Sequence, residues 1–213
     1  MQTWDENDTF EYKALEGRIP VITLLLIAVN AIVFFYTEWS GGSEDIDHMI
    51  DMGAMLYDRF VVKGEYYRII THFFLHFGFE HLGNNMISLA VLGYALEPEV
   101  GKIRFFIIYF FSGILAGIIS IVYNIMAGDL YAVSAGASGA IYGLMGALLA
   151  LMLFRRRRSI GSEIPRFILY VGISIYSGMQ DASIDNAAHV GGGLAGFFIC
   201  GLMCMLERMK ERR

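Results

Sequence analysis

Charged residues are scarce in this chain. Lys, Arg, Asp and Glu make up 17% of its 213 residues, against roughly 25% in typical soluble globular proteins. The net charge is −5 and there is no broad basic face, which argues against a nucleic-acid binder. Cysteine is scarcer still, and two cysteines cannot build the disulfide framework of a small secreted domain.

Apolar residues are what the chain has in abundance. They form 56% of the sequence, and the mean hydropathy is +0.52. Sixteen Phe and twelve Tyr are far more than a disordered chain carries. The composition therefore predicts an all-α polytopic membrane protein.

Runs without charged residues predict six membrane helices. An α-helix needs about 20 apolar residues to cross a hydrocarbon core of roughly 30 Å, and two of the runs are shorter than that. The helix of the first short run could start before its first residue, because an apolar lead-in begins at Ile69. The predicted spans are residues 19–37, 81–96, 105–128, 130–154, 167–180 and 186–206.

Positive charge predicts the orientation of these helices. With six spans both termini share one side, and that side holds 13 of the 16 Lys and Arg residues. The positive-inside rule then places both termini in the cytoplasm. The predicted organisation is a cytoplasmic segment at 1–18, a six-helix domain at 19–206 with an external loop at about 38–68, and a basic cytoplasmic tail at 207–213.

Four polar residues, far apart in the sequence, fall near the N-terminal ends of the second, fourth and sixth predicted helices. They are Ser138, His189, His81 and Asn85. Those three helices run from outside to inside, so the four side chains reach a similar depth in the outer half of the membrane. Polar side chains at such depths are costly and are candidates for function by default.

Small residues predict which of these helices touch. Gly139, Gly143 and Ala147 form a ridge on the fourth helix, and Gly192 and Gly196 form another on the histidine-bearing face of the sixth. Such ridges let helix backbones approach closely in lipid. Contact between the two ridges would bring the serine toward the histidine.

This juxtaposition favours nucleophilic catalysis. A serine hydroxyl becomes a nucleophile beside a neutral imidazole. His81 and Asn85 could donate hydrogen bonds to an oxyanion, together with backbone N–H groups and the dipole at the start of the fourth helix. Each residue alone has a structural interpretation: a serine bonded to its own helix, an interfacial histidine, or an asparagine that joins helices. Their joint occurrence at one depth is what favours a site.

The same residues resemble the rhomboid family of intramembrane serine proteases. The resemblance rests on three motifs in family order: H-x-x-x-N at His81 and Asn85, G-x-S-G around Ser138, and A-H-x-x-G at His189. Tyr142 matches the aromatic residue that in the family stacks on the catalytic histidine. The supporting positions that the resemblance assigns are Tyr142, Gly136, Gly139, Gly192, Gly196 and His76.

The resemblance implies a six-helix rhomboid-like bundle and a serine endopeptidase that cuts transmembrane helices of other membrane proteins near their external end. Ser138 would be the nucleophile, His189 the general base, and His81 and Asn85 the oxyanion donors. No aspartate is needed for such a dyad, and Asp185 is expected to be an exposed loop acid. The short helix at 167–180 matches the family's mobile helix.

The implied partners are transmembrane protein substrates and the lipid bilayer, without nucleic acid. No cofactor and no metal ion are expected. We also expect a multi-pass protein of a bacterial plasma membrane with cytoplasmic termini.

Two alternatives stay open at this stage. A catalytically inactive rhomboid-like binding scaffold would use the same fold, although such relatives typically lack the serine or the histidine. A metal site or metal transporter could use His72, His76 and Glu80, which fall at i, i+4 and i+8. Labelling by serine-directed probes and sensitivity to chelators would separate these alternatives from a serine protease.

Overall fold

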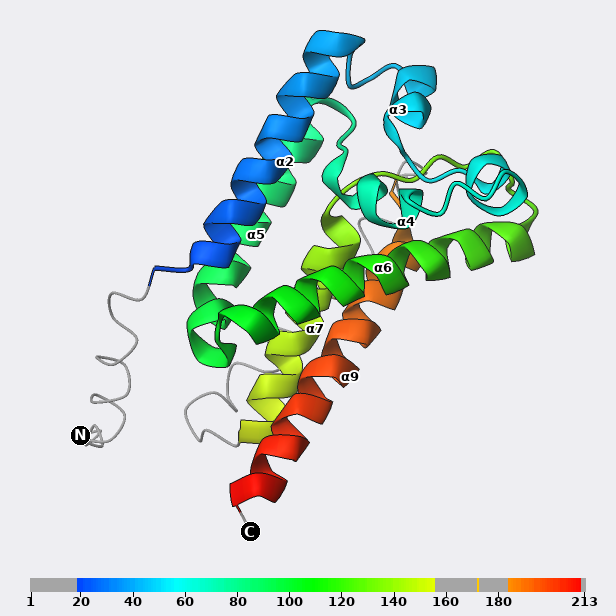
Figure 1. Ribbon diagram of the computed structural model, residues 1–213. Coiled ribbons are helices and arrows are strands. Elements are labelled where there is room, and N and C mark those ends of the chain that lie inside the picture. The colour runs from blue at the N-terminus through cyan, green and yellow to red at the C-terminus, as the bar shows by residue number, and fades with distance from the viewer. Residues whose placement is uncertain (1–18, 156–171, 173–183, 212–213) are drawn as a thin grey trace.

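The structure is a computed structural model that describes residues 19–155, 172 and 184–211 (Figure 1). Its described part is helical and contains no strand, so the all-α prediction is confirmed there. The long helices are α2 (Val21–Ser40), α5 (Gly78–Val100), α6 (Lys102–Ala127), α7 (Ser138–Arg155) and α9 (Asn186–Glu211). The short elements are α3 (Ile46–Met52), a π-helix (Asp58–Val62), α4 (Arg68–Thr71) and a 3₁₀ turn (His72–Phe74).

Three of the long helices have the length and composition of membrane spans, and α5 is not among them. Within the described residues, α2, α6 and α9 are long and apolar enough to cross a bilayer, with mean hydropathies of 2.1, 2.5 and 1.7. The α7 segment Ser138–Phe154 is a shorter apolar helix. Apart from residue 172, the predicted span at 167–180 lies outside the described residues, so the count of six spans stays a prediction.

Two predicted boundaries were wrong. The run at 130–154 becomes helical only at Ser138, because the backbone of Ser134 pairs with Met55 through N–H···O bonds of 2.9 and 3.0 Å. Gly136 also has a φ of +135°, which no α-helix contains. The helix predicted at 81–96 starts earlier, at Gly78, as the apolar lead-in allowed, but it continues past residue 96 to Val100, with Pro98 in its last turn.

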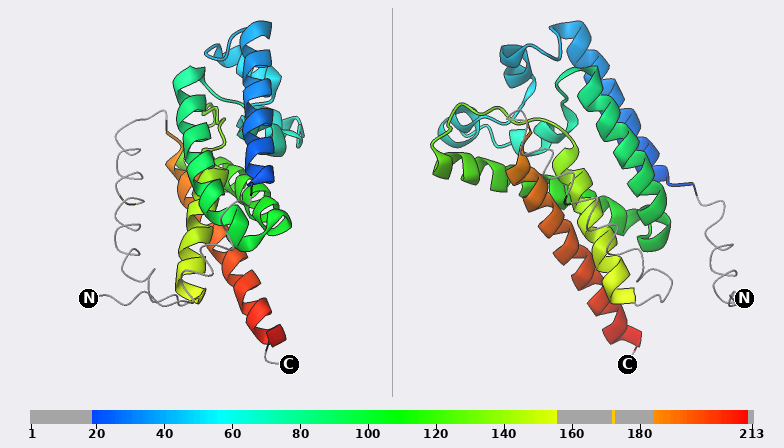
Figure 2. Two further views of the ribbon diagram at one scale, coloured as in Figure 1. Left: turned by 90° about the vertical axis from the view of Figure 1, so that its left-hand side faces the viewer. Right: turned by 180° about the vertical axis from the view of Figure 1, so that it is seen from behind.

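Pairs of neighbouring helices build the bundle. In Figures 1 and 2, α2 lies beside α5 and runs in the opposite direction, whereas α7 and α9 lie side by side and run in the same direction. The core fills the space between α5, α6, α7 and α9, where Leu89, Phe105, Ile108 and Leu144 are fully buried. Lipid tails are as apolar as these side chains, so the hydrophobic effect does not hold helices together within a bilayer. Helix association there depends on close packing of this kind.

Polar contacts fasten one end of the bundle. The Glu97 carboxylate of α5 accepts hydrogen bonds from the N–H groups of Ile22 and Thr23 (3.0 and 2.8 Å) and from the Thr23 hydroxyl (2.7 Å). It thereby satisfies N–H groups that the first turn of α2 leaves without acceptors. At the same end, Arg104 at the start of α6 pairs with Glu207 near the end of α9.

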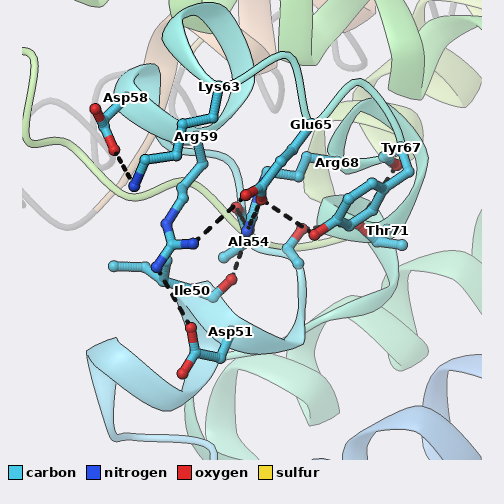
Figure 3. A network of polar contacts seen from close by, with 11 residues as sticks. Ile50, Asp51, Ala54, Asp58, Arg59, Lys63, Glu65, Tyr67, Arg68 and Thr71 are labelled. Carbon is cyan, nitrogen blue, oxygen red and sulfur yellow. Dashed lines mark hydrogen bonds and ion pairs between the residues drawn. The ribbon is translucent and has the colours of Figure 1, made fainter.

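The segment between α2 and α5 folds around a buried arginine (Figure 3). Arg68 is 1% exposed; its guanidinium pairs with Glu65 and donates to the carbonyl oxygens of Ile50 (2.5 Å) and Ala54 (2.8 Å). The Thr71 hydroxyl donates to the Gly53 carbonyl at 2.7 Å. A buried charge must be paired and hydrogen-bonded to be tolerated, so this segment is a defined platform and not a loose loop.

Candidate active site

Ser138 is the first residue of α7. Gly136, two residues earlier, lies against the ring of His81: a β-carbon there would come within 2.8 Å of Cε1 and 2.9 Å of Nε2. The same β-carbon would lie 3.8 Å from the Ser138 hydroxyl oxygen. The positive φ favours glycine, and the nearby His81 ring leaves no space for a side chain at this position. The structure therefore brings the His81 ring and the Ser138 hydroxyl close to the same residue, Gly136.

The backbone that leads into Ser138 is held from one side by two buried histidines. The Gly136 N–H donates to the His72 carbonyl at 3.0 Å, and the Ala137 N–H donates to Nε2 of His76 at 3.4 Å. The His76 ring also contacts the His81 ring edge-to-face, with centroids 5.2 Å apart. His76 thus contacts both the His81 ring and the serine loop, which is the connection between α6 and α7 at residues 128–137.

The histidine stripe that a metal site would need is not on one helix. His72 belongs to the 3₁₀ turn, and Leu75 is extended before α5 begins at Gly78. No cluster of three or more potential metal ligands occurs among the residues that the structure describes. The interrupted helix removes the spacing argument for the metal alternative.

His189 lies in the first turns of α9 and is 8% exposed. Its ring stacks on Tyr142 of α7, with centroids 4.2 Å apart and an interplanar angle of 12°. Since Tyr142 is one turn after Ser138, this stack places the imidazole beside the first turn of α7. The predicted stacking partner of the histidine is therefore confirmed.

The predicted glycine ridges meet between α7 and α9. A β-carbon on Gly192 would overlap the carbonyl oxygen of Gly139, and one on Gly196 would overlap that of Gly143. A third close approach is made by Gly146, whereas Ala147, the predicted third member of the ridge, is buried in the core. Only small residues let two helix backbones come this close.

Asn85 is a buried residue of α5 with a donor that is unpaired among the described residues. It lies one turn after His81 on α5 and is 6% exposed. Its side-chain nitrogen has no hydrogen-bond partner within the described part of the chain. An unsatisfied buried donor is costly, and a catalytic role is one of the reasons for which such a group is kept.

The prediction for Asp185 was wrong. It is not an exposed loop acid but a partly buried cap of α9, with Oδ1 accepting from the Ala188 N–H at 2.9 Å. Its Oδ2 accepts from the hydroxyls of Ser134 (2.6 Å) and Ser120 (2.5 Å). Nδ1 of His189 has no partner among the described residues, so these contacts give no Ser-His-Asp triad. An Asp just before an apolar helical run is an N-cap signal that could have revealed the capping role.

Comparison with known proteins agrees with this architecture. The Rhomboid domain family matches residues 63–206. The chain is 36% identical over 197 residues to rhomboid protease GluP of Bacillus subtilis (strain 168), covering 91% of this chain and 37% of GluP. It is 34% identical over 195 residues to YdcA of the same strain, covering 91% of this chain and 92% of YdcA. Arabidopsis thaliana RHOMBOID-like protein 5 is 37% identical over 151 residues, covering 70% and 47%.

The chain therefore belongs to the rhomboid family. Membership of this family, together with the apolar helices, supports an integral membrane protein. The chain spans well under half the length of GluP. Relatives occur in a bacterium and in a plant, so the bacterial plasma membrane stays a prediction.

Proposed function

We propose that this protein is an intramembrane serine endopeptidase, with Ser138 as nucleophile and His189 as general base. The observation that carries the proposal is the contact between α7 and α9. The Tyr142–His189 stack and the glycine ridges hold a buried imidazole next to the turn of α7 that begins with Ser138.

In the proposed reaction, His189 takes the proton of the Ser138 hydroxyl as its oxygen attacks a peptide carbonyl. Asn85, His81 and the first N–H groups of α7, which have no acceptor within the helix, donate to the oxyanion that forms. His189 then gives its proton to the leaving amine, and water releases the acyl group from Ser138. Tyr142 orients the imidazole ring, without an aspartate among the described residues bonded to that ring.

The proposed substrates are transmembrane helices of other membrane proteins, cut near their external end. A helix must unwind locally before its carbonyl can be attacked, so we expect small or helix-weakening residues near the cleaved bond. Both termini of this chain would lie in the cytoplasm. An inactive scaffold is less well supported, because the serine, the histidine and the unpaired donor of Asn85 are all present.

A reconstituted cleavage assay tests the proposal. The protein and its Ser138→Ala variant are compared on a generic transmembrane reporter, with Ser88→Ala of α5 as the matched serine control. We expect cleavage by the wild type and by Ser88→Ala, fluorophosphonate labelling of Ser138, and activity that withstands EDTA. Cleavage by Ser138→Ala would overturn the dyad, and loss of activity in EDTA would revive the metal alternative.

A further inference from the structure

We infer that Asp185 is a positioning residue for the reaction: it fixes the start of α9, and with it His189, relative to the loop that leads into Ser138. The inference rests on the proposed function, because it assigns a purpose to the spacing between the proposed nucleophile and base. It goes beyond helix capping, which would serve α9 alone.

One half of the Asp185 contacts is local. Oδ1 accepts from the Ala188 N–H at 2.9 Å, and the Asp185 carbonyl accepts from the His189 N–H at 3.1 Å. These are the contacts of an ordinary N-cap, which satisfies N–H groups in the first turn of a helix. They would exist in any helix that begins with an aspartate.

The other half reaches distant elements. Oδ2 accepts from the hydroxyl of Ser120, which is in α6 and 1% exposed, and from the hydroxyl of Ser134 at 2.6 Å. Hydroxyl groups bonded to a carboxylate form short, strong hydrogen bonds. A cap alone needs neither partner, so these contacts point to a joint between α9, α6 and the serine loop.

Ser134 is the member of this joint that connects to the nucleophile. Its N–H and C=O both pair with Met55, and it precedes Ser138 by four residues. The loop is thus held by Met55 on its backbone and by Asp185 on its side chain. Hydrogen bonds join His189 to Asp185 and Asp185 to Ser134, and four residues further along the chain is Ser138.

The glycine ridges explain why such a joint is needed. They allow a close approach of α7 and α9, but Gly139, Gly143, Gly192 and Gly196 have no side chains that interlock against sliding along the helix axis. The hydrogen bonds of Asp185 add a polar fixed point at the end where His189 lies. A displacement of about 1 Å between reacting groups can lower a rate by roughly 10²-fold.

Asp185→Ser separates capping from positioning. Serine is a good N-cap, but its side chain is one atom shorter and has a single oxygen, so it loses Ser120 and Ser134. Ser134→Ala removes only the link to the loop and leaves the cap intact. Ser43→Ala is the matched control, because its hydroxyl also donates to a carboxylate, that of Glu38 at 2.5 Å, on the distant α2–α3 connection.

The test measures kcat and KM for the transmembrane reporter and the rate of fluorophosphonate labelling of Ser138. We expect both Asp185→Ser and Ser134→Ala to lower kcat and the labelling rate by about 10-fold or more, with KM changed by less than about twofold. The double variant should be no worse than the poorer single variant, because both break one joint. Ser43→Ala should keep the wild-type kcat.

The outcomes separate this inference from the proposed function. The inference would be overturned if Ser134→Ala and Asp185→Ser both kept the wild-type kcat, or if their losses added in the double variant. An inactive Ser138→Ala would in that case still support the proposed dyad. An active Ser138→Ala would overturn the proposed function itself. If Asp185→Ser fails to fold, Ser134→Ala alone decides the inference. This variant keeps the Asp185 cap of α9 and the backbone pairing of residue 134 with Met55.

Discussion

The rings of Tyr142 and His189 lie nearly parallel, with their centroids 4.2 Å apart. One ring comes from α7 and the other from α9, so the stack is a direct contact between the proposed nucleophile-bearing and base-bearing helices. It also limits the orientations that the imidazole can adopt. An imidazole without an aspartate partner needs another means of orientation, and the tyrosine ring supplies one.

The first prediction concerns this stack. Tyr142→Leu should lower kcat by about 10-fold or more, because a mobile imidazole spends less time aligned with the Ser138 hydroxyl. Tyr142→Phe keeps the ring and should lose much less. Steady-state cleavage of the reporter by the two variants is the measurement. Equal losses in both would show that the stacked ring is not what matters.

The second prediction concerns the dyad as a unit. Ser138→Ala and His189→Ala should each abolish cleavage, and the double variant should be no slower than either, because a nucleophile without its base is as ineffective as no nucleophile. Single-turnover assays with all three variants test this. Substantial cleavage by His189→Ala would contradict its assignment as the base.

The third prediction concerns the oxyanion donors. Asn85→Ala and His81→Ala should lower kcat more than they raise KM, since the oxyanion exists only along the reaction path. Removing one such donor costs about 10² to 10³ in rate in soluble enzymes, and the N–H groups of α7 would soften the loss here. Turnover within about threefold of wild type for both variants would remove them from the site.

Sequence predicted the parts of this site that depend on motif spacing and helix periodicity. Tyr142 reaches the His189 ring, and Gly192 and Gly196 meet Gly139 and Gly143. These follow because residues on one face of a helix are fixed by the helical repeat.

What sequence could not predict depends on partners far along the chain. Residues 130–137 are apolar enough to suggest helix, but the pairing of Ser134 with Met55 overrides that tendency. The Asp185 carboxylate finds Ser120 and Ser134, which are 65 and 51 residues away. Hydropathy contains no information about such contacts, so the joint became visible only in three dimensions.

The fourth prediction is a pH dependence of stability. A hydrogen bond from Arg68, with further ones from Tyr67 and Arg59, lowers the pKa of Glu65 below its usual value. The unfolded chain then binds more protons than the folded one between the two pKa values, so stability rises with pH there. The contribution of Glu65 is complete above about pH 4.3, the usual pKa of a glutamate, and is lost as pH falls through the lowered pKa.

Thermal unfolding in detergent at a series of acidic pH values measures this effect. Glu65→Gln should melt at a lower temperature than the wild type at neutral pH, and the difference should shrink as the pH falls. Asp129→Asn, an exposed change at the end of α6, is the control. A difference that stays constant over the whole acidic range would show that Glu65 acts through something other than its charge.

The fifth prediction tests whether the glycine ridge positions the proposed base. Gly196 is two turns after His189, and a β-carbon there would overlap the backbone of Gly143. Gly196→Val should therefore push α9 from α7 without touching either member of the dyad. Because about 1 Å of displacement can cost roughly 10²-fold in rate, we expect a lower melting temperature and the loss of most cleavage and most Ser138 labelling, with insertion unchanged.

Gly83→Val is the matched control, since a β-carbon at Gly83 meets nothing within 4 Å and the residue lies on the face of α5 opposite His81 and Asn85. If Gly196→Val melts and labels like Gly83→Val, the two backbones do not need their close contact, and the position of His189 must be set by Tyr142 and Asp185 alone.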